Sequence, residues 1–515
     1  MSETQLLQPP PAENDTGERV LIDHSSRRWW ALGVIALAQL MVVLDATIVT
    51  IALPYAQVDL GISDANRQWA LTAYTLIFGG LLLLGGRLAD YLGRRRMFLI
   101  GLGGFAASSA LAGLAWNEMS FFGGRALQGG FAAVLAPAAL SLVTVTFVEQ
   151  KERARAFAVY AAVSAGGAAI GLIAGGALTE YLSWRWTLLI NTPIAVLAAV
   201  GALVLVLRDR PAARRRGYDL PGAVTVTAGL VGLVYAFTRA AEVGWSANST
   251  VALFFAAAVL LAAFVVIESR SENPLLPLRI PGEINRGGAY LVALITPIPM
   301  FAMFMFLSYY FQNTLGYTPL KAGIAFLPFP AGIVVAAGIA SSLLPRIGPR
   351  IPMIVGSVLG IAGLLYLAQL DSQSTWSVNV LPSQLLIAGG MGMVFVAMQS
   401  VALHRIEERD AGVASALLNT GQQVGGSVGL ALLSTIVGQV LARHPGGAMT
   451  VDPSSGQPVP VDPAGFVDAS IYSYDVGFYW GAGFFVVALI VTLVTIRLRA
   501  SDMGEETQNA VHVAA

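Results

Sequence analysis

The chain of 515 residues contains no cysteine, only two lysines and only four histidines. Without cysteine it can form no disulfide, thiolate metal site, iron–sulfur cluster or cysteine nucleophile. Neither Lys151 nor Lys321 follows a glycine, so a Walker A phosphate loop is excluded, and with it an ATP-driven pump with its own nucleotide domain. The histidines are too far apart in sequence for a histidine metal motif: His24, His404, His444 and His512. A metal-dependent or thiol-dependent membrane enzyme is therefore a poor fit.

Charge is also scarce, since charged residues make up 12% of the chain and hydrophobic residues 56%. A soluble globular protein carries about 25% charged residues, so most of this chain must lie outside water. Stretches apolar and long enough to cross a bilayer, at about 20 residues each, predict fourteen spans at about 29–53, 68–86, 97–116, 121–146, 156–178, 187–207, 219–240, 250–268, 287–311, 322–344, 351–370, 379–403, 411–440 and 475–498.

The distribution of positive charge predicts the orientation of these spans, because Lys and Arg gather on the cytoplasmic side of membrane proteins. If the N-terminus is inside, 24 of the 30 Lys and Arg residues lie inside and Arg125 lies within a span. The remaining five lie outside: Arg67, Arg185, Arg239, Lys321 and Arg443. Both termini are then cytoplasmic, in a multi-pass protein of a bacterial inner membrane.

Comparing the chain with itself shows a duplication. Three glycines spaced four residues apart in the fifth span recur in the thirteenth at an offset of 254: Gly167, Gly171 and Gly175 match Gly421, Gly425 and Gly429. At an offset of 255, Gly93 and Arg95 match Gly348 and Arg350. Residues four apart lie on one side of a helix, so these glycines predict close helix packing. The repeat predicts an all-α membrane protein with two six-helix bundles.

Segments outside the repeat complete the predicted domain organisation. The two bundles are separated by a basic cytoplasmic linker and an inserted two-helix hairpin, and both ends of the chain are expected to be cytoplasmic tails, the first one disordered. The boundaries are a tail at 1–28, a first bundle at 29–207, a linker at 208–218, the inserted pair at 219–268, a second bundle at 287–498 with a long outer loop at 442–473, and a tail at 499–515.

The segment Gly86-Arg-Leu-Ala-Asp-Tyr-Leu-Gly-Arg-Arg-Arg96 resembles the loop signature of the major facilitator superfamily between spans 2 and 3. Ordinary cytoplasmic charge explains the arginines but not the Gly-x-Leu-Ala-Asp-x-x-Gly frame. In that family the segment latches the two halves on the cytoplasmic face. The resemblance therefore implies a cytoplasmic gate made of Gly86, Asp90, Gly93, Arg94 and Arg95.

Further motifs resemble the fourteen-span drug:proton antiporter branch of that superfamily: Leu44-Asp-Ala-Thr-Ile-Val-Thr-Ile-Ala-Leu-Pro54, Trp69 and Tyr74 in the second span, Arg125-Ala-Leu-Gln-Gly129, Ser183-Trp-Arg-Trp186 and Asn191-Thr-Pro193. The resemblance covers about residues 29 to 498 and implies the major facilitator fold with fourteen transmembrane helices. One departure concerns span 5, where Leu172 replaces the proline of a Gly-Pro-x-x-Gly-Gly stretch. The helix bend that this proline causes is not expected here.

Asp45 and Arg125 are the charged residues that lie well away from the ends of the predicted spans. A charge in hydrocarbon costs about 2.5 to 3.5 kcal/mol, so each is expected to have a partner or a function. Their depths allow a contact, directly or through water. Burial raises the pKa of a carboxyl group and a nearby Arg lowers it, so moving the Arg would load or unload a proton. This favours proton coupling, and the alternative is a purely structural ion pair. Gln39 and Asn191 extend this network or bond neighbouring helices.

The ninth span is dense in Met and aromatic side chains, including Met303 and Phe304. Such adaptable groups suit a cavity for varied apolar substrates, although packing against lipid explains them equally well. The predicted substrate cavity combines these two residues with four from the first half of the chain: Gln39, Trp69, Tyr74 and Asn191.

The sequence thus predicts a multidrug efflux transporter that exports hydrophobic or cationic drugs by proton antiport and alternating access. It needs no cofactor or metal beyond the proton motive force, and its expected partners are the substrate, protons and the lipid bilayer, with no nucleic acid. An exporter of a lipid or secondary metabolite on the same scaffold remains open, as does a transporter-like sensor. The substrate, the proton stoichiometry and the oligomeric state are not specified by these residues.

Overall fold

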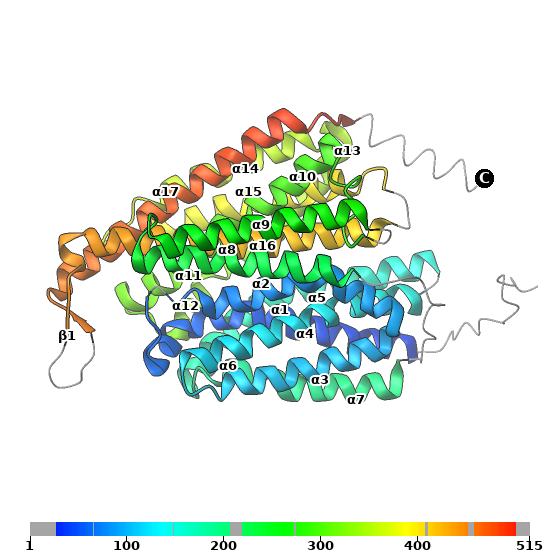
Figure 1. The fold of residues 1–515 in the computed structure, drawn as a ribbon, viewed down its shortest axis with the longest axis horizontal. Helices are drawn as coiled ribbons and strands as arrows, with labels where there is room; N and C mark the ends of the chain where they lie inside the picture. Colours follow the sequence, from blue (N-terminus) through cyan, green and yellow to red (C-terminus); the bar gives the residue numbers. More distant parts are fainter. Residues whose placement is uncertain are drawn as a thin grey trace, which may run out of the picture.

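A computed structural model describes residues 27–64, 66–147, 149–206, 219–271, 274–406, 410–451 and 458–500. Within these ranges, fourteen helical segments are long and apolar enough to cross a membrane, which confirms the predicted number of spans. The predicted linker and most of the two predicted tails lie outside the described residues. The molecule is elongated. Helix α1 begins and helix α17 ends at one end of it, and the strand β1 lies at the other end (Figure 1). We call these the terminal end and the strand end.

The first bundle corresponds to the predicted spans 1 to 6. Its sixth span is divided by a break between a short helix and a longer one. The helices are α1 (Arg27–Leu60), α2 (Trp69–Leu92), α3 (Arg94–Gly113), α4 (Glu118–Thr146), α5 (Gln150–Tyr181), α6 (Trp186–Leu189) and α7 (Asn191–Leu205). Leu172 stands where the family that the sequence resembles often has proline, and α5 is one uninterrupted helix.

The inserted pair and the second bundle follow, and three spans of the second bundle are built from more than one helix. The elements are α8 (Leu220–Val243), α9 (Asn248–Arg270), α10 (Ile284–Ile295), α11 (Pro297–Tyr309), the π-helix η2 (Tyr310–Thr314), α12 (Pro319–Ala325), α13 (Pro328–Ile347), α14 (Arg350–Leu367), the π-helix η3 (Trp376–Val380), α15 (Leu381–Leu403), α16 (Ala411–Arg443), the 3-10 turn η5 (Pro445–Gly447), β1 (Met449–Val451), β2 (Pro458–Pro460) and α17 (Pro463–Thr495). The two strands pair antiparallel.

The last helix begins earlier than the sequence predicts. We expected its span to start at about residue 475, after an outer loop at 442–473, but α17 starts at Pro463. Asp462 caps the helix by accepting a hydrogen bond from the amide of Ala464, and proline at the first helical position has no amide that needs a partner. The Pro- and Gly-rich composition of this region concealed this helix start.

The duplication seen in the sequence recurs in the geometry of two turns. Gly93, between α2 and α3, has φ +97°, and Gly348, between α13 and α14, has φ +73°. These left-handed conformations favour glycine. Two residues after each glycine, Arg95 and Arg350 donate to main-chain carbonyls of α7 and α17, at 2.7 and 2.9 Å. A glycine turn followed by an arginine that bonds to the last helix of its bundle therefore occurs in both bundles at the terminal end.

The repeated glycines lie where helices pack closely. A Cβ atom on Gly171 of α5 would lie 2.0 Å from the hydroxyl oxygen of Thr47 on α1, and one on Gly425 of α16 would lie 1.7 Å from the carbonyl oxygen of Leu294 on α10. No side chain fits at such distances. The other predicted packing glycines lie on the same two helices: Gly167, Gly175, Gly421 and Gly429.

The inserted pair covers the boundary between α2 of the first bundle and α16 of the second. Its green helices lie between the blue and cyan bundle and the yellow and red bundle in Figure 1. The hydroxyl of Thr238 on α8 accepts hydrogen bonds from Gln68 and Trp69, at 2.9 and 3.0 Å. On the other side, Thr435 and Gln439 of α16 donate to main-chain carbonyls of α8, at 2.9 and 3.1 Å. The pair thus contacts both bundles.

Hydrogen bonds join the two bundles in the half of the molecule nearer the strand end. Ser308 of α11 donates to the carbonyl of Thr50 on α1 at 2.9 Å, and Gln312 of η2 donates to the carbonyl of the next residue at 3.1 Å. The amide of Leu320 on α12 donates to Glu180 of α5 at 3.0 Å. These contacts close the strand end.

The close approach of α16 to α10 gives a test. We expect Gly425→Ala to lower the thermal unfolding temperature of the detergent-purified protein, because overpacking of this kind costs about 1 to 3 kcal/mol. Gly438→Ala is the matched control in the same helix, since nothing lies within 4 Å of its added Cβ. It should be neutral or slightly stabilising. An equal loss of stability in both variants would contradict the packing role of Gly425.

Candidate functional site

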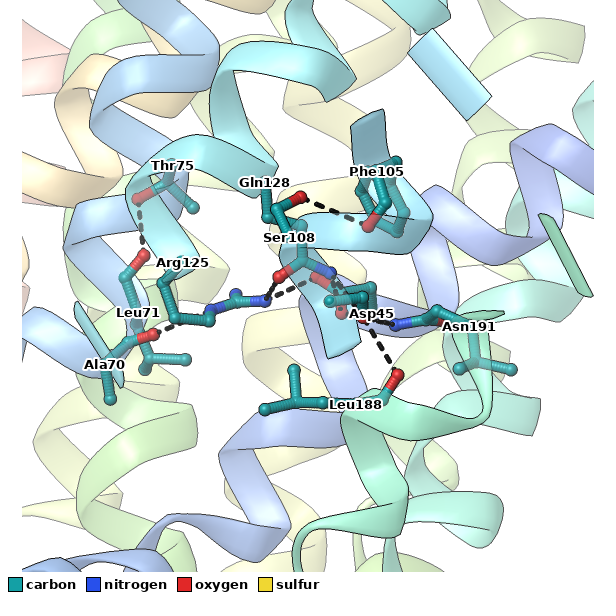
Figure 2. Close-up of polar contacts among 12 residues, drawn as sticks. Asp45, Ala70, Leu71, Thr75, Phe105, Ser108, Arg125, Gln128, Leu188 and Asn191 are labelled. Atoms are coloured by element: carbon teal, nitrogen blue, oxygen red, sulfur yellow. Dashed lines mark hydrogen bonds and ion pairs between the residues drawn. The ribbon is translucent and has the colours of Figure 1, made fainter. Parts of the chain in front are cut away.

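A cluster of polar side chains lies within the first bundle, away from solvent. Asp45 comes from α1, Ser109 from α3, Arg125 and Gln128 from α4, and Asn191 from the first turn of α7. All five residues are completely buried. Figure 2 shows Arg125, Gln128 and Asn191 pointing toward the carboxylate of Asp45. The cluster is therefore built by the packing of four spans rather than by one segment.

The carboxylate of Asp45 accepts three hydrogen bonds. Arg125 Nη1 lies 2.6 Å from its Oδ2, and Gln128 Nε2 and Asn191 Nδ2 each lie 2.7 Å from its Oδ1 (Figure 2). The same Nη1 of Arg125 also donates to Gln128 Oε1 at 2.7 Å. Gln128 thus bridges the two charged groups, which fixes the direction of each. Charge-assisted hydrogen bonds at these distances are among the strongest in proteins.

Ser109 forms the second layer of the cluster. Its hydroxyl accepts hydrogen bonds from Gln128 Nε2 at 3.1 Å and Asn191 Nδ2 at 3.0 Å, and it donates to the carbonyl of Leu188 at 2.8 Å. Leu188 belongs to α6, so the broken sixth span contributes both a main-chain carbonyl and the Asn191 amide. This layer orients the two amide side chains that hold Asp45.

Arg125 is held on its other side by α2. Its Nε donates to the carbonyl of Ala70 at 3.1 Å, and its guanidinium carbon lies 4.5 Å from the ring centroid of Tyr74. Among the described residues, Arg125 Nη2, Asn191 Oδ1 and the Tyr74 hydroxyl have no hydrogen-bond partner. Buried polar groups normally have one, and bound water is the usual partner where protein supplies none. Three buried polar atoms around Arg125 are therefore left without a protein partner in the described part of the chain.

The structure brings together three of the residues predicted for this region. Asp45 and Arg125 form a direct ion pair, and Asn191 extends it. Gln39 does not take part, because its Oε1 accepts a hydrogen bond from the Tyr160 hydroxyl of α5 at 2.6 Å. Gln39 therefore bonds to a neighbouring helix, which is the second of the two roles predicted for it.

The other residues predicted to line a substrate cavity lie in different surroundings. Trp69 bonds to the inserted helix α8, and Tyr74 stacks on Arg125. Met303 is completely buried, and the ring of Phe304 lies 5.0 Å from that of Phe326 within an aromatic cluster of the second bundle. Their role in substrate binding stays a prediction.

Sequence reasoning missed two members of the cluster. The spacing of Arg125 and Gln128, three residues apart on one helix, places both on one face and was a usable signal. Ser109 has no such signal. Asp475 lies twelve residues into α17, because that helix starts earlier than predicted. Its Oδ1 has no hydrogen-bond partner among the described residues. That Asp45 and Arg125 are the charged residues well away from the span ends stays a prediction.

The predicted gate residues lie at the terminal end. Gly86 is in α2, Gly93 forms the turn after it, and Arg94 and Arg95 begin α3. Arg95 is held against the end of α7. The side chain of Asp90 lies outside the described residues, although its backbone belongs to α2. The role of these residues in gating stays a prediction.

Across the described residues, a mainly helical fold with fourteen membrane-length helices, two similar bundles and a buried charged cluster between helices has the architecture of a secondary membrane transporter. The chain belongs to the Major Facilitator Superfamily, whose family model matches residues 35–430. The family suggested by the motifs of the sequence is thereby confirmed.

Similar proteins include several linked to antibiotics. The chain is 45% identical over 488 residues to the puromycin resistance protein pur8 of Streptomyces alboniger, covering 94% of each protein. It is 38% identical to the cephamycin export protein CmcT of Amycolatopsis lactamdurans, covering 81% of this chain and 86% of the relative. A solved bacterial homolog of the human lysosomal transporter Spinster, in an inward-facing and occupied conformation, shares the fold with a TM-score of 0.66 at 15% identity, covering 93% of this chain and 98% of that one.

The buried ion pair yields a stability test. Arg125→Met leaves the carboxylate of Asp45 without its charged partner, and breaking a buried pair typically costs about 3 to 5 kcal/mol. We expect a large fall in thermal unfolding temperature, and partial recovery in the double variant Asp45→Asn, Arg125→Met. Arg239→Met is the control, because the Arg239–Glu242 pair is exposed and should contribute little. Strictly additive effects of Asp45→Asn and Arg125→Met would contradict the coupling.

Proposed function

We propose that this protein exports small hydrophobic or cationic compounds across the bacterial cytoplasmic membrane in exchange for protons, by alternating access. The observation that carries this proposal is the carboxylate of Asp45, which is completely buried and held by Arg125, Gln128 and Asn191. A proton carrier in a membrane must be able to exist in both charged and neutral forms, and a carboxyl group is able to do so.

Protonation of Asp45 changes the forces within the first bundle. The neutral acid no longer attracts the guanidinium of Arg125, and the amides of Gln128 and Asn191 lose a charged acceptor. Because these groups lie on α1, α4 and α7, loss of the charge loosens one bundle rather than one side chain. Release of Arg125 then leaves its guanidinium beside the ring of Tyr74, whose hydroxyl has no hydrogen-bond partner among the described residues. Two protonation states thus favour two arrangements of the same helices.

The contacts between the bundles support an assignment of direction. The hydrogen bonds of Ser308, Gln312 and Glu180 join the two bundles near the strand end. We therefore infer that substrate enters from the terminal end. The bias of Lys and Arg supports our assignment of the terminal end to the cytoplasm. Export then requires the strand end to open and the terminal end to close. We assign that closure to the cytoplasmic gate around Gly86, Asp90 and Gly93, with Arg94 and Arg95 as its cations.

The relatives support the class of cargo. Their names associate them with resistance to or export of puromycin and cephamycin. We therefore place drugs and secondary metabolites together as candidate substrates. One proton entering down about 100 mV supplies about 2.3 kcal/mol, and each pH unit adds about 1.36 kcal/mol. At about one pH unit, this sustains a gradient of a few hundredfold per proton without nucleotide hydrolysis.

Removal of the titratable group tests proton coupling. In reconstituted vesicles with an imposed pH difference, Asp45→Asn is expected to abolish uphill accumulation of substrate while downhill exchange persists, because asparagine keeps the shape but cannot carry a proton. Asp468→Asn is the control, since it makes the same chemical change at an exposed position of α17. Uphill transport by Asp45→Asn at the rate of this control would exclude Asp45 as the proton carrier.

Orientation is directly testable because the native chain has no cysteine. Ser372, exposed between α14 and η3 near the strand end, and Ser269, exposed at the end of α9 near the terminal end, are suitable positions. We expect an impermeant maleimide added to whole cells to label Ser372→Cys, and to label Ser269→Cys only after the membrane is opened. The opposite labelling pattern would reverse the proposed direction of transport.

A further inference from the structure

The turn between α1 and α2, at the strand end, places a cationic side chain against the second bundle. Arg67 lies in this turn, yet it is only 5% exposed. Its guanidinium carbon lies 4.6 Å from the ring centroid of Tyr309, which belongs to α11. Arginine in a connecting turn normally keeps its charged group in water. Burial of Arg67 against an aromatic ring of the other bundle therefore calls for an explanation.

Two further residues of the first bundle complete a ring of contacts around Tyr309. The hydroxyl of Tyr309 donates to Oε1 of Gln57, near the end of α1. The Nε2 of Gln57 donates to Asp64 Oδ1 at 2.9 Å, and Arg67 Nη1 donates to the same oxygen at 3.3 Å. The contacts thus run from the face of the tyrosine ring back to its hydroxyl. We call Gln57, Asp64, Arg67 and Tyr309 the tyrosine clamp.

The clamp differs in kind from the other contacts that close the strand end. Ser308 and Gln312 donate to main-chain carbonyls of α1, which a residue of any type supplies. The clamp instead recognises both chemical features of a tyrosine, because a cation covers the ring face and an amide oxygen accepts from the hydroxyl. Exclusion of water strengthens such a cation–π contact. The clamp is therefore a contact between the bundles that depends on particular side chains.

Arg67 reaches a second helix of the other bundle as well. It interacts with Tyr474 of α17, whose ring is stacked on that of Phe306 of α11 with the centroids 5.5 Å apart. The Nε of Arg67 is buried and has no hydrogen-bond partner among the described residues. An unpaired buried donor is unfavourable, and it regains a partner from water when the bundles part. The closed contact thus contains one feature that favours its release.

We propose that the tyrosine clamp sets the balance between the closed and the open strand end, with Arg67 as its positioning residue. This inference rests on the alternating access proposed above. Three members of the clamp belong to the first bundle and Tyr309 belongs to the second, so the four cannot stay together when the strand end opens. An interaction that exists in one of two states shifts the population toward that state. Loss of Arg67 therefore raises the population of the open strand end.

A distance between spin labels measures this population. The native chain has no cysteine, so labels are placed through Met119→Cys at the start of α4 and Val378→Cys in η3. Both residues are exposed near the strand end, one on each bundle. In pulsed electron paramagnetic resonance of the purified full-length protein, we expect Arg67→Met to raise the ratio of long to short distances by about threefold to tenfold, as for loss of a buried cation–π contact.

Arg185→Met is the matched control. Arg185 Nη2 lies 2.8 Å from Asp59 Oδ2, and its guanidinium carbon lies 4.7 Å from the ring centroid of Trp184. The control therefore removes the same two kinds of contact at the same end of the molecule, but within the first bundle. Its distance distribution should match that of the unaltered protein. Equal distributions for Arg67→Met and Arg185→Met overturn the proposed clamp.

Tyr309→Phe gives a second measurement from the other bundle, which also applies if Arg67→Met does not fold. It keeps the ring and removes the hydroxyl that donates to Gln57, so we expect a shift in the same direction of about twofold to fivefold. An unchanged distribution in Tyr309→Phe likewise refutes the clamp. The measurement needs neither substrate nor a pH difference. Failure of proton-coupled transport in vesicles therefore leaves this inference standing, and the reverse also holds.

Discussion

The ion pair between Asp45 and Arg125 is the constraint around which the first bundle is organised. Neither charge is stable alone in a membrane, so each needs partners from neighbouring helices. Gln128 and Asn191 complete the coordination of the carboxylate, and Ser109 orients their amides. The break between α6 and α7 fits this arrangement, because it supplies a carbonyl to the same network. Within the described residues of the second bundle, no charged pair is buried to this degree.

Helix α1 connects this charged centre to the contact between the bundles. Thr50 lies five residues after Asp45, and its carbonyl accepts the hydrogen bond of Ser308 from the second bundle. A change in the charge of Asp45 and a change in the closure of the strand end therefore act on the same stretch of helix. The second bundle contributes a Met-rich and aromatic core instead, with Met303 and Phe304 among its members. Apolar packing is common to both bundles, whereas the completely buried ion pair lies in the first.

The features that depend on hydrophobicity and periodicity were predictable from sequence. Span number, the paired bundles and the close packing at Gly425 all follow from patterns along the chain. The contact of Asp45 with Arg125 was predictable because two isolated charges in hydrocarbon need each other. The surroundings of Trp69 were not, since its partner Thr238 lies on an inserted helix with no counterpart in the repeat. The early start of α17 depended on a local cap at Asp462 that composition obscured.

The inserted helix α8 is attached unequally to its two neighbours. Toward α2 it offers one side-chain hydroxyl, that of Thr238, which can rotate or exchange partners. Toward α16 it offers main-chain carbonyls bonded by Thr435 and Gln439, which are fixed in the helix. In the alternating access proposed above, we expect the weaker attachment, through Thr238, to part first. The inserted pair would then move with the second bundle, and α2 would slide against α8.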